Sequence, residues 1–182
     1  MYALVSGRVG VWSGGERGDP MLLAILGPGE MFGEMAILSD ERVRTASTQA
    51  LSKVEVIQIL RTDIEALRQR FPRMSEMFIQ LLLRLVQRLT TQVSELSELD
   101  STTRLYRQIW RLGEVFEKRK TGAELPISQQ QLASMTGVGL RITNQVLNQA
   151  RREGILETGK RRIVVTDWAM VRRRAGLRFR PG

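Results

Sequence analysis

A glycine, two charged residues and a hydroxyl residue lie close together in the first third of the sequence, in a spacing that suits a phosphate ester. Gly33 leads a predicted short helix, and such a helix offers backbone N–H groups to an anion. Arg44 would neutralise the phosphate, Thr45 would donate a hydroxyl hydrogen bond, and Glu34 would accept one from a ribose hydroxyl. An ion pair between Glu34 and Arg44 across a surface loop is the alternative. The predicted ligand-binding residues of this stretch are Gly33, Glu34, Met35, Ala36, Arg44 and Thr45.

Residues 139–153 form an amphipathic pattern whose polar side is suited to base pairs. Arginine reads guanine through two acceptors, and asparagine and glutamine can read adenine. Arg151 and Arg152 lie further along and suit phosphate contacts. A solvated polar face would look similar, so both interpretations stay open. We expect an inward side of Ile142, Val146, Leu147 and Ala150, and a groove-facing side of Leu140, Arg141, Asn144, Gln145 and Asn148.

The neighbouring segments have the order of a winged helix-turn-helix. Ser128 and Gln131 have capping-box spacing before a short helix, and Gly137 lies where a tight turn between helices needs a residue without Cβ. Two strand-like runs follow at 155–158 and 162–166, joined by a basic turn that can reach a phosphate. We therefore add Gln129, Arg151, Lys160 and Arg161 to the predicted DNA-binding residues.

A long helix is predicted from Pro72 to Leu99, because no glycine or further proline interrupts it. Its apolar residues recur at alternating spacings of three and four, with a β-branched residue at each a position and leucine at each d position. This heptad pattern favours a parallel two-stranded coiled coil; packing on the chain's own β domain is the alternative. Asp100 can cap the next helix and is the predicted hinge, and 118–124 is expected to be an exposed loop. The predicted dimer seam is Ile79, Leu82, Val86, Leu89, Val93 and Leu96.

Residues 2–60 predict short strands broken by glycine turns. Residues 21–26 are an apolar run typical of a buried strand. Thr62 and Glu65 have capping-box spacing, which predicts a short helix that runs to about Arg70. The front of the chain is thus expected to be a β domain that ends at this helix.

The chain has 182 residues and contains neither cysteine nor histidine. These absences exclude disulfides, iron–sulfur clusters and thiolate metal sites, and remove the commonest general base and haem ligand. We therefore expect no catalytic residue, no haem and no metal, and so no enzyme. No apolar run is long enough to cross a bilayer, and the start does not resemble a signal peptide. We expect a cytoplasmic protein without a membrane partner.

The net charge of +9 is unevenly distributed. Residues 1–100 carry 11 basic and 13 acidic side chains, whereas residues 101–182 carry 17 basic and 6 acidic ones. A basic back half predicts a polyanionic partner for that half alone. A solvated basic tail containing Arg172–Arg174 would explain part of the excess, but the back half stays basic without it.

The stretch Phe32–Leu38, followed by Arg44 and Thr45, resembles the phosphate-binding cassette of cyclic-nucleotide-binding domains. Together with the long helix, Asp100 and the winged helix, residues 2–167 resemble the cyclic AMP receptor protein and fumarate–nitrate regulator (CRP/FNR) family of bacterial transcription regulators. The resemblance implies an α+β fold in three parts. These are an N-terminal antiparallel β-roll of the jelly-roll, cyclic-nucleotide-binding kind (1–71), a long dimerisation helix (72–99) and a C-terminal winged helix-turn-helix (100–182).

The resemblance also implies a mechanism. It predicts a homodimer that binds a pseudo-palindromic operator in double-stranded DNA, works with RNA polymerase, and is controlled allosterically by cyclic AMP or another cyclic nucleotide. Thr90, on the long helix, then joins the predicted ligand-binding residues.

The chain departs from the family pattern in three places. The family's adenine contact is a Thr-Ser or Thr-Asn pair that falls on Leu89 and Thr90, and leucine cannot form a hydrogen bond, so another effector stays open. Leu-Arg-Ile at 140–142 replaces the family's Arg-Glu-Thr, so we expect a different operator. The family's β-roll normally begins before the Tyr2–Gly7 stretch, so we expect a roll that lacks its first part.

Two other functions remain open from the sequence. The chain could be an effector-independent regulator of this family with a vestigial ligand site. Alternatively, it could be a cyclic-nucleotide-sensing regulatory subunit whose basic segment docks on a protein partner. Steeply salt-dependent DNA binding would exclude the second of these.

Overall fold

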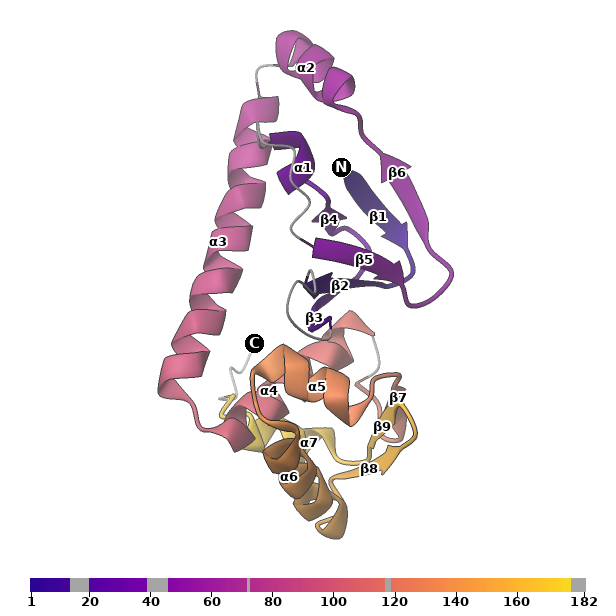
Figure 1. Cartoon of the computed structure of the whole chain (residues 1–182), viewed down its shortest axis with the longest axis vertical. Coiled ribbons are helices and arrows are strands. Elements are labelled where there is room, and N and C mark those ends of the chain that lie inside the picture. Colours follow the sequence, from indigo (N-terminus) through magenta and orange to yellow (C-terminus); the bar gives the residue numbers. More distant parts are fainter. Residues whose placement is uncertain (14–19, 39–45, 72, 117–118, 178–182) are drawn as a thin grey trace. The chain divides into compact units, whose positions relative to one another are not determined.

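The fold is taken from a computed structural model, which describes residues 1–13, 20–38, 46–71, 73–116 and 119–177 (Figure 1). The backbone divides into two compact units. One ends at Glu98 and the other begins at Leu99, except that residues 20–25 group with the second unit. No helix in the described ranges has the length and apolarity that crossing a membrane requires.

Two three-stranded sheets build the front of the chain. Antiparallel pairing joins residues 2–6 to residues 31–32 and 55–58 in one sheet, and residues 9–13 to residues 46–50 in the other, so the predicted antiparallel β part is confirmed. Leu4 and Val9 are almost completely buried and anchor the core of this part. The first sheet has the strand order β4 (Met31–Phe32), β1 (Tyr2–Ser6), β6 (Glu55–Gln58). The second sheet has the order β3 (Leu22–Leu26), β2 (Val9–Ser13), β5 (Ala46–Ala50).

Two helices follow the strands. Helix α2 (Arg61–Arg70) begins two residues earlier than the predicted cap at Thr62 implies, and its first turn is capped by Asp63, whose Oδ2 accepts the N–H of Leu60 at 2.8 Å. The predicted capping box of Thr62 with Glu65 is therefore wrong, because the aspartate at the third helical position already reaches the free N–H. Helix α3 (Met74–Glu98) is the long helix, and Figure 1 shows it as one continuous rod.

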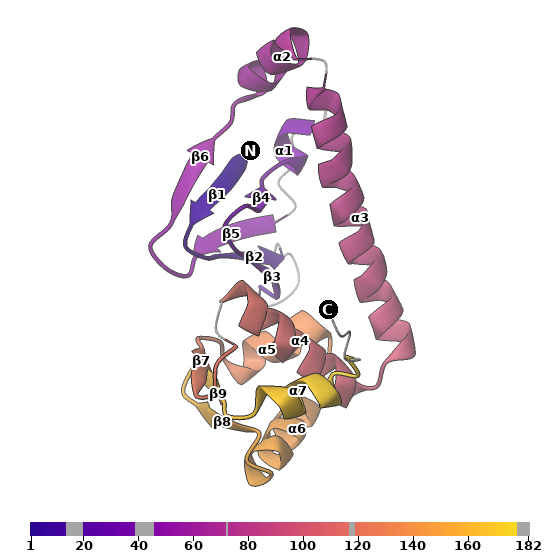
Figure 2. The same cartoon turned by 180° about the vertical axis from the view of Figure 1, so that it is seen from behind.

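The second unit packs helices on a small sheet. Helices α4 (Ser101–Val115), α5 (Gln129–Thr136), α6 (Leu140–Arg152) and α7 (Trp168–Arg174) surround a core of fully buried aliphatic side chains. The sheet has the order β7 (Ala123–Leu125), β9 (Arg162–Val165), β8 (Leu156–Gly159). Figures 1 and 2 show α7 along α4, and α6 beside β8.

Two elements of this unit differ from the sequence-based expectation. Ala123 and Glu124, expected in an exposed loop, belong to β7 together with Leu125; β7 pairs with β9 and buries Leu125 opposite Ile163. Arg172–Arg174 are the end of α7 and not a solvated tail, because Trp168 and Val171 on the same helix are buried. Both elements exist because an apolar residue finds a partner distant in the sequence.

Candidate nucleic-acid interface and effector site

The turn between α5 and α6 is fixed by local chemistry. Ser128 Oγ accepts the N–H of Gln131 at 3.1 Å, and Gln131 Oε1 accepts the N–H of Ser128 at 2.8 Å. Gly137 ends α5 with φ +63°, in the left-handed region that favours glycine. The predicted cap and turn are confirmed, and they set the point at which α6 begins.

The inward side of α6 differs from the prediction at two positions, Ile142 and Thr143, while Val146 is half-buried. Thr143, Leu147 and Ala150 are buried, whereas Ile142 is 45% exposed. Thr143 can be buried because its hydroxyl donates to the carbonyl of Gly139 at 3.2 Å, which satisfies the polar group within the helix. The prediction that Ile142 faces the core is therefore wrong.

The outward side of α6 is polar and carries no carboxylate. Leu140 is 41% exposed. Asn144 is half-buried, and its side-chain oxygen is enclosed without a hydrogen-bond partner among the residues that the structure describes, so this residue is less available than its exposed neighbours. The other predicted reading residues are exposed, and so are the cations in the last turn: Arg141, Gln145, Asn148, Arg151 and Arg152.

The acidic residue that follows α6 is neutralised. Glu153 Oε2 accepts from Arg174 Nη2 at 2.9 Å, and its Oε1 accepts from Gln149 Nε2 at 2.7 Å. A carboxylate at a helix C-terminus is unfavourable beside the helix dipole, so these donors stabilise it. The positive charges of the last turn remain the dominant charge at this end of the helix.

The β8–β9 hairpin presents two cations at its tip. The pairing of Gly159 with Arg162 leaves Lys160 and Arg161 as a two-residue loop, and both side chains are exposed. Arg161 has φ +58°, which is unusual for a residue with a Cβ. Within the part of the chain that the structure describes, neither tip cation forms an ion pair, whereas Arg162 pairs with Glu124 at 3.5 Å. Gln129, the first residue of α5, is half-buried.

The cassette residues that the structure describes form a turn and a short helix. Gly33 has φ +73°, Glu34 is half-buried, and the N–H of Ile37 donates to the Glu34 carbonyl at 3.0 Å. Helix α1 (Met35–Leu38) follows, with Met35 exposed and Ala36 half-buried. Arg44 and Thr45, the predicted cation and hydroxyl of this site, lie outside the described residues.

A contact that the sequence analysis did not find links α3 to the turn before the cassette. Glu30 Oε2 accepts the N–H of Gly27 at 2.7 Å, and Glu30 Oε1 accepts from Arg88 Nη1 at 3.1 Å. Glu30 and Arg88 are 58 positions apart in the sequence, so no local sequence pattern indicates that they pair. Both side chains are partly exposed, so the ion pair is worth at most about 1 kcal/mol.

The seam predicted on α3 stays exposed in the part of the chain that the structure describes. All its residues are exposed, by between 42% for Leu82 and 63% for Val93; the others are Ile79, Val86, Leu89 and Leu96. Thr90 is exposed as well. A row of aliphatic side chains left in water at heptad spacing is typical of a helix that packs against another helix.

Asp100 lies between α3 and α4 and caps α4 as predicted. Its Oδ1 accepts the N–H groups of Thr102 and Thr103 at 2.8 and 3.0 Å, and its Oδ2 accepts the Thr103 hydroxyl at 2.7 Å. The hydroxyl of Thr103, followed by these backbone donors, lowers the pKa of the Asp100 carboxyl. The charged aspartate therefore stabilises the start of α4.

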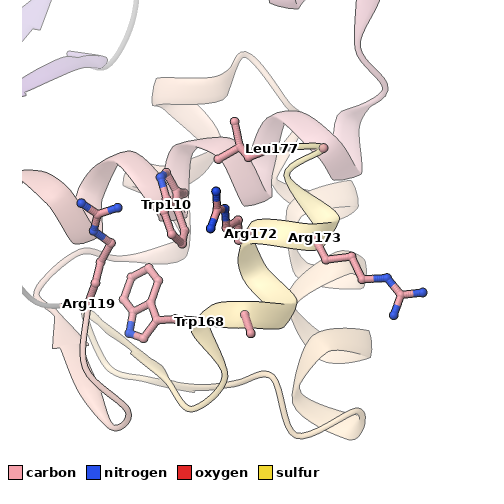
Figure 3. Close-up of a pocket in the computed structure, with 8 residues that line it drawn as sticks. Trp110, Arg119, Trp168, Arg172, Arg173 and Leu177 are labelled. Carbon is pink, nitrogen blue, oxygen red and sulfur yellow. The ribbon is translucent and has the colours of Figure 1, made fainter. Parts of the chain in front are cut away.

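An aromatic pocket of about 730 Å³ lies on α4 and α7 (Figure 3). The rings of Trp110 and Trp168 meet edge to face at 6.0 Å, and Trp168 Nε1 donates to the Lys120 carbonyl at 2.9 Å. The guanidinium of Arg119 lies over Trp110 at 4.7 Å from its centroid, while Arg173 points away. This cluster holds α7 on α4, and no spacing in the sequence indicated it.

Two family models match the chain. The cyclic nucleotide-binding domain matches residues 1–71, and the Crp-like helix-turn-helix domain matches residues 103–174. The chain belongs to the CRP/FNR family of transcription regulators.

Relatives span nearly the whole chain. The cyclic AMP receptor protein of Thermus thermophilus is 29% identical over 171 residues, which are 94% of this chain and 77% of the relative. The CRP-like cAMP-activated global transcriptional regulator of Mycobacterium tuberculosis is 25% identical over 178 residues, 96% of this chain and 79% of the relative. A solved CRP/FNR-family regulator from Thermus thermophilus has the same fold, with a TM-score of 0.80 at 19% identity, over 96% of this chain and 87% of that one.

Proposed function

We propose that the protein is a homodimeric, sequence-specific DNA-binding transcription regulator whose β-roll is controlled by a cyclic nucleotide. In this proposal residues 1–71 sense the effector, residues 72–99 join the subunits and residues 100–182 bind DNA. The observation that carries the proposal is the outward side of α6, which is exposed, polar, basic and free of carboxylates.

The proposed reading of DNA assigns chemical roles to residues of α5, α6 and the β8–β9 tip. Arg141 reads guanine through its two acceptors, and Gln145 and Asn148 read adenine. Arg151, Lys160 and Arg161, together with Gln129, contact phosphates and fix the position of α6 in the major groove. Two subunits would place their α6 helices in successive major grooves, about 34 Å apart.

The proposed effector site combines the cassette with α3. The left-handed backbone at Gly33 and the half-buried Glu34 fit a cyclic phosphodiester that is held by backbone N–H groups. Arg44 and Thr45 complete the phosphate contacts, and Thr90 contacts the base from α3. Relatives named for cyclic AMP support this nucleotide as the first effector to test.

One observation favours a second candidate function. Leu89, in the position of one of the family's adenine contacts, is apolar and 51% exposed, so it offers no hydrogen bond to a base. A regulator of the same family that recognises another effector, or works without one, is therefore the alternative. Under either candidate, the DNA-binding unit turns about Asp100, and RNA polymerase is the proposed protein partner.

Selection of binding sites from random DNA, with and without cyclic AMP and cyclic GMP, tests the proposal. We expect a pseudo-palindromic operator whose affinity falls steeply with salt and rises with one of the nucleotides. Arg44→Ala should abolish the nucleotide effect, while Arg73→Ala, at an exposed arginine outside the cassette, should not. Selection of an operator that ignores every nucleotide would favour the effector-independent alternative, and failure to select any operator would overturn the proposal.

A further inference from the structure

The first turn of α6 exposes two aliphatic side chains on an otherwise polar surface. Leu140 is 41% exposed and Ile142 is 45% exposed, and Arg141 lies between them. The core does not use Ile142, because Thr143, Leu147 and Ala150 already fill the inward side of the helix. Branched aliphatic side chains left in water gain free energy when an apolar group covers them.

The partner of these side chains can be identified from the chemistry of the major groove. Of all the base edges in that groove, only thymine carries a methyl group, and apolar side chains distinguish thymine by contact with it. The N-terminal residues of a recognition helix are the ones that reach base edges. Leu140 and Ile142 are the first and third residues of α6.

We propose that Ile142, assisted by Leu140, is a specificity-determining residue that reads thymine methyl groups in the operator. The inference rests on the proposed function and names the base chemistry that the operator must contain. Isoleucine suits this role because its χ1 is fixed in a helix, so its methyl groups are held in one place.

Its neighbours on the helix support the same base composition. Ile142 and Gln145 are three residues apart and so lie next to each other on the helix surface. Glutamine reads adenine, and a thymine methyl and the adenine donor–acceptor pair belong to the same type of base pair. Arg141 adds a guanine contact. The half-site is therefore expected to place A·T pairs beside one G·C pair.

The test replaces thymine by deoxyuridine, which removes the methyl group and leaves base pairing unchanged. Operators recovered by selection with the full-length wild-type chain are synthesised with single thymine-to-deoxyuridine changes, and their affinities are measured. We expect at least one such change per half-site to weaken wild-type binding about fourfold, the effect of one buried methyl group. Ile142→Ala should weaken binding to the thymine operator by a similar factor and should bind both operators equally.

The controls separate this inference from the proposed function. Ile57→Ala removes an exposed isoleucine of β6 and should retain the wild-type preference for thymine. If the wild-type chain selects no operator, the proposed function fails. If it selects an operator but no deoxyuridine change matters, or if Ile142→Ala weakens both operators while the preference for thymine persists, the reading of thymine by Ile142 is wrong.

Discussion

At the scale of single residues, the hydroxyl of Thr143 affects which side of α6 faces outward. Its hydrogen bond to the Gly139 carbonyl lets a polar residue occupy the core, and the neighbouring Ile142 is then left at the surface. A hydrogen-bonded hydroxyl is buried at little cost, whereas an unpaired one costs about 1–3 kcal/mol. The apolar character of the first turn of α6 therefore depends on a bond made inside the helix.

Asp100 has a comparable influence at the start of α4, and its contribution depends on pH. The hydrogen bonds from Thr103 and Thr102 favour the charged carboxylate and hold its pKa below the ordinary value of 3.8. Because the folded-state pKa is lowered, the stabilisation is complete above the unfolded pKa. It is lost as the pH falls through the lower, folded-state value.

Asp100→Ala should lower the free energy of unfolding by about 1 kcal/mol at neutral pH, because two backbone N–H groups lose their acceptor. Urea unfolding at neutral pH and at decreasing acidic pH measures this difference, which should shrink once the carboxyl is protonated. Asp100→Asn is the matched control, because it keeps the acceptor oxygen and removes the charge. Equal stability of wild type and Asp100→Ala at neutral pH would contradict this role.

At the scale of elements, the attachment of α7 to α4 depends on a position without a side chain. A Cβ built on Gly113 would lie 2.4 Å from Cη2 and 2.7 Å from Cζ3 of Trp168, closer than real atoms approach. The indole is held in place by its hydrogen bond to the Lys120 carbonyl and by Trp110. The close contact of the two helices therefore requires glycine at position 113.

Gly113→Ala should destabilise the second unit by about 1–3 kcal/mol, as overpacking does, although alanine is the better helix former. Chemical unfolding followed by tryptophan fluorescence measures the change. Gly139→Ala is the control, because a Cβ there meets nothing within 4 Å, and its stability should stay within about 1 kcal/mol of wild type. A Gly113→Ala variant that is more stable than wild type would show that the Trp168 ring can move away from the added Cβ at little cost.

The same elements show what the sequence can and cannot predict. The α5–α6 turn was predictable because Ser128, Gln131 and Gly137 act on residues only a few positions away. Helix α7 and strand β7 were not, because their apolar residues find partners in distant segments. The Glu30–Arg88 pair is long-range for the same reason. For Thr143 and Ile142, apolar periodicity gave the wrong inward residue because it counts threonine as polar.

At the scale of the whole molecule, the proposed function requires a second copy of the chain. The back half carries the excess of positive charge, but a single α6 would read only half of the proposed pseudo-palindromic site. The exposed seam on α3 is the surface that can join two copies. Joining two half-site readers raises the effective affinity by about 10²- to 10⁴-fold without any new DNA contact.

Val86→Glu should therefore produce a monomer, because it places a carboxylate in the middle of the apolar seam. Sedimentation would report the loss of the dimer, and affinity for a palindromic operator should fall by about 10²- to 10⁴-fold. Gln87→Glu introduces the same side chain one residue away and off the seam, and it should stay dimeric. A dimeric Val86→Glu variant would show that the subunits meet elsewhere.

The tip of the β8–β9 hairpin carries a further consequence. The left-handed backbone of Arg161 costs about 1–2 kcal/mol relative to the same conformation in glycine. A laboratory screen for heat resistance would therefore enrich glycine at this position and discard the cation that the proposed phosphate contact needs. Variants evolved for robustness alone should drift toward weaker operator binding, starting at this loop.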